Sequence, residues 1–166
     1  MEEGLVAKLV EILDKENEIY ETLYKLSNNK TELISGGKVQ ELENIVKVEQ
    51  TLVIKISKLE EQREKIVGEL CTVLGLKPEA VTISELSAKL GDDKSTLLKE
   101  CKDKMLKIIN KLKDTNELNS RLIKNSLEYI DFSINMMTSI DNVNNSYGSS
   151  GFVGDTSKRN LFDIKL

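Results

Sequence analysis

The stretch DDKSTLLKECKDKMLKIINKLKDTNELNSRLIKNSLEYIDFSINMMTSIDNVNNSY, residues 92–147, decides the fold. It contains neither Gly nor Pro, and its stripe positions recur at intervals of three and four residues, which places them on one side of a helix. The stripe comprises Cys101, Met105, Ile108, Leu112, Thr115, Asn119, Leu122, Ser126, Tyr129, Ser133, Met136, Ile140 and Val143. A helix of about 50 residues is roughly 75 Å long. We therefore expect it to lie against other long helices or against a partner protein.

Two shorter apolar seams precede this stretch. The first runs from Leu5 to Leu33 in steps of four and three residues, and the second runs from Leu42 to Val73. Gly36-Gly37 follows the first seam and Gly75 the second, and glycine after a last turn commonly ends a helix. Because the connection between the two seams is short, their helices must be antiparallel neighbours. We predict an all-α fold, an elongated antiparallel bundle of three long helices with coiled-coil-like packing.

The predicted bundle spans residues 1–146, with helices at about 3–35, 38–74, 82–90 and 93–145. The short third helix lies in the linker that begins at Lys77, and Thr82 and Glu85 have the spacing of a capping box. Residues 147–166 are rich in Gly and Ser and show no helical period. We expect them to form a flexible tail with apolar docking residues, which are Tyr147, Phe152, Leu161 and Phe162.

The composition argues against several classes of protein. The net charge of −4 comes from interspersed signs, so no basic face indicates nucleic acid. The first residues are acidic (Glu2, Glu3), unlike those of a secretory signal, and no apolar run approaches the length of a membrane span. We expect a cytoplasmic protein that does not insert into a membrane.

The sequence offers little for catalysis. It has no His for general base work, and no phosphate-binding, dinucleotide-binding or nucleophile-elbow motif. Its two cysteines, Cys71 and Cys101, lie on apolar helix faces, where we expect buried reduced thiols rather than a metal site. We expect no enzymatic activity, no metal and no cofactor. An enzyme built on a helical bundle is the weakest alternative.

Four ionisable residues interrupt the first two seams, and their positions suggest two pairs. The residue numbers of Glu16 and Arg63 add up to 79, and so do those of Lys30 and Glu49. The residue numbers of facing partners in an antiparallel hairpin have a constant sum. The position of the Gly turn implies a slightly smaller sum than 79, which corresponds to an offset of about two residues, or roughly 3 Å, along each helix. We predict both ion pairs, with a role in fixing register. The alternative is that these side chains reach solvent at the seam edge.

The last predicted helix carries more apolar residues near its end than one stripe needs. Tyr129, Phe132, Met136, Met137 and Ile140 gather there. Methionine suits surfaces that bind varied partners, and an amphipathic helix of a partner can lie in an apolar groove. We propose these five residues as a protein-binding site; packing against the first helix is the alternative.

Two groups of residues form a recognisable pattern. The first two seams contribute Glu16, Tyr20, Leu23, Leu26, Lys30 and Leu33 before the Gly turn and Leu42, Glu49-Gln50, Leu52, Leu59-Glu60 and Arg63 after it. The end of the chain contributes Tyr147-Gly148, Gly151, Leu161-Phe162-Asp163 and Lys165. In these residues the chain resembles the FlgN-like flagellar export chaperones.

The resemblance implies a cytoplasmic chaperone of the flagellar type III secretion system. Such proteins bind hook-associated proteins one and three, prevent their premature assembly and deliver them to the export gate. Their client-binding region corresponds here to about residues 126–143, and the tail is the candidate for contact with the export gate or its ATPase. The alternative is a cytoplasmic coiled-coil adaptor that oligomerises through the same stripe and has no role in export.

Overall fold

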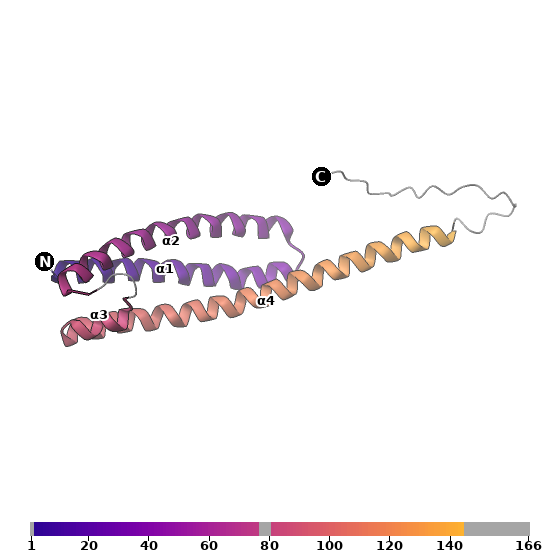
Figure 1. Cartoon of the computed structure of the whole chain (residues 1–166). Coiled ribbons are helices and arrows are strands. Elements are labelled where there is room, and N and C mark those ends of the chain that lie inside the picture. Colours follow the sequence, from indigo (N-terminus) through magenta and orange to yellow (C-terminus); the bar gives the residue numbers. More distant parts are fainter. Residues whose placement is uncertain (1, 77–80, 145–166) are drawn as a thin grey trace. The chain divides into compact units, whose positions relative to one another are not determined.

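The computed structural model describes residues 2–76 and 81–144, with side chains to residue 139. This part of the chain contains four α-helices and no strand, which confirms the all-α class (Figure 1). The helices are α1 (Glu2–Ser35), α2 (Val39–Leu74), α3 (Ile83–Lys89) and α4 (Asp92–Asn144). The chain divides into two compact units, Met1–Leu127 and Glu128–Leu166, so the boundary falls within α4.

A glycine turn reverses the chain between α1 and α2. Gly37 has a φ of 65°, a backbone conformation that residues with a Cβ atom rarely adopt. The Lys38 N–H donates to the Leu33 carbonyl at 2.9 Å, so the backbone groups at the end of α1 are satisfied by the turn itself. As a result α2 returns alongside α1 in the opposite direction (Figure 1).

A capping box starts the short helix α3, as the sequence predicts. The Thr82 N–H donates to Glu85 Oε2 at 2.8 Å, and the Glu85 N–H donates to Thr82 Oγ1 at 3.3 Å. Leu86 and Leu90 are buried in the main apolar cluster. The linker between α2 and α4 therefore contributes to the core, a role that its sequence did not suggest.

The apolar core of the first unit gathers where the start of α1, the end of α2, α3 and the start of α4 meet. It contains Leu5, Val6, Leu9, Leu13, Leu70, Cys71, Leu86, Leu90, Leu98, Cys101 and Met105. Both cysteines are free and buried, as predicted. Fully burying one leucine side chain contributes about 1.5–3 kcal/mol, so the buried leucines in this cluster stabilise the unit substantially.

Polar contacts fix the direction of the first part of α4 against α1. Lys94 Nζ lies 3.2 Å from Glu2 Oε1, and the Cys101 thiol donates to Asp14 Oδ1 at 3.7 Å. Further along, the Ser27 hydroxyl donates to Asn116 Oδ1 at 2.7 Å. Because both residue numbers rise together, this part of α4 runs in the same direction as α1 and opposite to α2.

Candidate functional site

The structure brings together the members of both predicted ion pairs between α1 and α2. Arg63 Nη1 lies 3.0 Å from Glu16 Oε2, and Lys30 Nζ lies 2.9 Å from Glu49 Oε2. The two pairs lie three to four helical turns apart along α1, so they bracket the middle of the hairpin. Their proposed role in setting register rests on this spacing.

The Glu16–Arg63 pair holds its carboxylate almost completely out of contact with water. The Glu16 side chain is only 1% exposed, and its Oε1 atom has no hydrogen-bond partner in the described part of the chain. Burial raises the pKa of the Glu16 carboxyl above its ordinary value of 4.5, although the Arg63 guanidinium opposes this shift. Glu60 adds a further upward shift in the pKa of Glu16. Removal from water therefore outweighs the attraction of Arg63.

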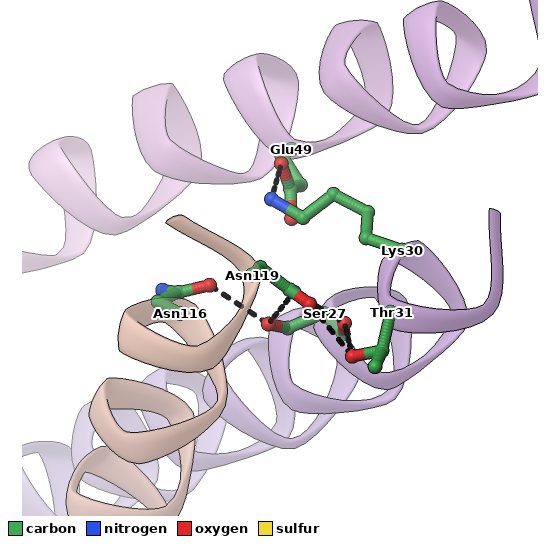
Figure 2. A network of polar contacts seen from close by, with 6 residues as sticks. All are labelled: Ser27, Lys30, Thr31, Glu49, Asn116 and Asn119. Carbon is green, nitrogen blue, oxygen red and sulfur yellow. Dashed lines mark hydrogen bonds and ion pairs between the residues drawn. The ribbon is translucent and has the colours of Figure 1, made fainter. Parts of the chain in front are cut away.

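A network of uncharged polar side chains joins α1 to α4 beside the Lys30–Glu49 pair (Figure 2). The buried Asn119 donates from Nδ2 to the Ser27 carbonyl at 2.8 Å and to the Ser27 hydroxyl at 3.2 Å. It also accepts from the Thr31 hydroxyl at 2.7 Å. A buried amide with its donors and acceptor satisfied holds one alignment of two helices, because sliding either helix would leave it unpaired.

The sequence prediction did not include this network. Thr115 and Asn119 stand in the α4 stripe as polar interruptions, the same signal that pointed to the four charged residues of α1 and α2. The α1 partners carry no such signal, because Ser27 and Thr31 fall outside the seam through Leu26 and Lys30. They belong to a second face of α1, the face that packs against α4.

Exposed apolar side chains crowd the end of α4, in the second unit. Tyr129 is 73% exposed, Phe132 62% and Met136 56%. Together with three neighbours they form what we call the C-terminal apolar face: Tyr129, Ile130, Phe132, Ile134, Met136 and Met137. Large exposed apolar patches are frequent at sites that bind other proteins.

The C-terminal apolar face is wider than one helix stripe. At about 100° per residue, the positions from Phe132 through Tyr129 to Ile134 spread over roughly 200° of the helix circumference. Asp131 and Asn135 occupy the remaining side. A single packed neighbour needs a stripe of about 100°, so this face can contact more than one segment of a partner.

Some predicted site residues lie outside the described part of the chain. Ile140 belongs to α4, but its side chain is not among those described, and Tyr147, Phe152, Leu161 and Phe162 all follow residue 144. Their part in binding or docking stays a prediction.

The described residues contain neither a metal-binding cluster nor a candidate membrane span. No group of three or more His, Cys, Asp or Glu side chains there is arranged to hold a metal ion. None of the described helices combines the length and apolar character needed to cross a membrane. Burial raises the pKa of the Cys101 thiol, and the neighbouring Asp14 carboxylate raises it further, which favours the protonated thiol.

Comparison with known proteins gives one family and one relative. The model of the family described as FlgN protein matches residues 1–152. The Bacillus subtilis (strain 168) protein described as "Uncharacterized protein YvyG" is 31% identical over 158 residues, which cover 95% of this chain and 96% of that protein. No solved structure matches the chain.

Proposed function

We propose a specific role for this chain from its family: it belongs to the FlgN protein family, whose members are flagellar export chaperones. It binds hook-associated proteins one and three in the cytoplasm, prevents their premature assembly and delivers them to the export gate. The architecture that we propose for this role is the antiparallel bundle of three long helices expected from the sequence.

The observation that carries the proposal is the exposure of the C-terminal apolar face. A protein that assembles through amphipathic terminal helices exposes apolar stripes before assembly, and such stripes promote aggregation. Phe132 and Met136 lie on one side of α4 and can cover a stripe of this kind. Methionine adapts to clients of different shape because its side chain is unbranched and has three rotatable bonds.

The same surface suits release as well as binding. The contacts are non-covalent and apolar, so a client can be handed on without chemistry. We propose that the tail, through Tyr147, Phe152, Leu161 and Phe162, contacts the export gate or its ATPase while α4 holds the client. The two tasks then fall to different segments of the chain.

Co-expression with the C-terminal helix of hook-associated protein one tests the proposal. We expect a soluble complex of one chain with one client helix, and we expect the double substitution Phe132→Asp and Met136→Asp to abolish it. The matched control is Leu97→Asp with Leu106→Asp, which places two charges at exposed apolar positions elsewhere on α4.

The outcomes separate the chaperone from the adaptor. Loss of the complex only in the Phe132 and Met136 variant supports the chaperone. Tight self-association through the C-terminal apolar face, with no client bound, would instead identify a coiled-coil adaptor. Deleting residues 147–166 should spare client binding and impair export; loss of client binding on this deletion would move the site to the tail.

A further inference from the structure

A groove in the first unit lies between α2 and the first part of α4, with α1 as its floor. Its volume is about 590 Å³. Tyr20 and Leu23 of α1 form the floor, Val53 and Ile56 of α2 form one wall, and Leu112 and Ile123 of α4 line the other. We call this the α2–α4 groove. All of its lining residues belong to the Met1–Leu127 unit.

The α2 wall belongs to a second apolar face of that helix. Val39, Val46 and Val53 recur every seven residues and are all exposed. A seven-residue repeat keeps them on one side of the helix, the arrangement used in packing against another long helix. They extend over about 21 Å, so a matching helix would need about four turns. Of these three valines only Val53 lines the groove, and Val39 and Val46 continue the same exposed face of α2 beyond it.

The groove also carries a negative charge that has no ion-pair partner among the described residues. Glu60 lines it, and no described lysine or arginine forms an ion pair with the Glu60 carboxylate. The other two charged lining residues, Lys30 and Glu49, neutralise each other at 2.9 Å. Burial is the main cause of the raised pKa of Tyr20 on the groove floor, and the Glu60 carboxylate raises this pKa further. A cation on the occupant would complement this carboxylate.

We propose that the α2–α4 groove binds a second amphipathic helix of the client, one with apolar residues at seven-residue spacing and a Lys or Arg placed against Glu60. This inference rests on the proposed chaperone function and extends it from one client-binding surface to two. A helix fits better than an extended strand, because the described groove walls are helices whose backbone groups already pair with each other.

Two substitutions on α2 test the groove with a matched control. Val53 and Val48 are the same residue type on the same helix and are 56% and 48% exposed, but only Val53 lines the groove. We expect Val53→Asp to weaken the affinity for full-length hook-associated protein one by about tenfold or more. Val48→Asp should leave that affinity within about twofold of the unaltered chain. Circular dichroism checks that both variants keep their helix content.

Photo-crosslinking gives a second readout that does not depend on the folding of a charged variant. A photo-crosslinking amino acid at position 53 should link to the client, and the same amino acid at position 48 should not. We also expect Glu60→Gln to weaken client binding by about threefold at low salt and by less at high salt.

Each remaining outcome overturns the proposal in a distinguishable way. If the client binds but both valine variants bind it equally well, the chaperone function stands and the groove is not a client site. If position 53 links only to another copy of this chain, the occupant is a second copy. If the unaltered chain binds no client, the proposed function and this inference both fail.

Discussion

The two parts of α4 carry similar apolar patterns but have different surroundings. In the first part Leu98, Cys101 and Met105 are buried among residues of α1, α2 and α3. In the second part Tyr129, Phe132 and Met137 are more than half exposed. Apolar spacing predicts a helix in both places, so spacing alone does not distinguish a buried face from an exposed one.

The difference shows what an excess of apolar residues means on a long helix. The buried part of α4 places small or satisfied polar residues, such as Ser95 and Asn119, among its apolar ones. The exposed part spreads large apolar side chains over roughly 200° of its circumference. This excess of exposed apolar surface is the basis on which we propose that a client covers the second part of α4.

Matched methionines on α4 give the largest effect expected from this comparison. Met105 is 9% exposed and Met137 is 70% exposed. We expect Met105→Ala to lower the free energy of unfolding by about 2–3 kcal/mol, because it leaves a cavity in the core. Met137→Ala should change it by less than about 0.5 kcal/mol. Urea denaturation of both variants measures the difference, and equal effects would mean that the two parts of α4 are covered alike.

Removing the buried amide tests how the first part of α4 is held in place. We expect Asn119→Ala to lower the free energy of unfolding by about 2 kcal/mol, since it leaves the Thr31 hydroxyl and the Ser27 carbonyl without this partner. Asn125→Ala, an exposed position on the same helix, is the control and should cost less than about 0.5 kcal/mol. A loss no larger at Asn119 than at Asn125 would show that the network does not hold α4 to α1.

Charge reversal tests the hairpin against which α4 packs. We expect Lys30→Glu or Glu49→Lys alone to lower the free energy of unfolding by about 1 kcal/mol, because like charges then face each other at a half-buried site. The double reversal should recover most of this loss. Thermal or urea unfolding measures the free energy of unfolding of the three variants. A double variant as unstable as the single variants would contradict a role of this ion pair in register.

Glu16 gives the smallest expected effect and a pH signature. Its pKa is raised in the folded state, so folding favours the protonated carboxyl. The stability that this group contributes is therefore fully present below the ordinary carboxyl pKa of 4.5 and is lost as pH rises through the higher folded value. We expect Glu16→Gln to raise the free energy of unfolding at pH 7 by less than about 1 kcal/mol, because the amide has no charge to remove from water and the Arg63 side chain is 31% exposed.

The pH series for Glu16→Gln supplies its own control. The gain over the unaltered chain should shrink towards pH 4 as the native carboxyl becomes protonated. A gain that is the same at both pH values would show that ionisation of Glu16 does not limit the stability of the hairpin.

Much of the fold follows from local sequence signals. Periodic apolar residues and glycine stops predict the long helices, and the spacing of Thr82 and Glu85 predicts the capping box that starts α3. These features depend on neighbours in the chain. The meeting of Glu16 with Arg63 could also be expected, because a short turn fixes which residues of two antiparallel helices face each other.

The rest depends on contacts between distant segments, which a single sequence does not contain. Ser27 and Asn119 are buried together only because α4 packs on a second face of α1. Leu86 enters the core because α3 folds onto it, which nothing in the linker sequence indicates. The crowding of large apolar residues near Phe132 was visible in the sequence, which left open whether they pack against the first helix; in the structure they are exposed.

Hydrogen–deuterium exchange of the chain, alone and saturated with hook-associated protein one, tests the central claim most directly. The claim is that the second part of α4 is the surface that a client covers. We predict slower exchange of the backbone amides of residues 128–139 in the complex, with unchanged exchange over residues 95–105. Slower exchange confined to residues 95–105, or no change anywhere in α4 at saturation, would contradict it.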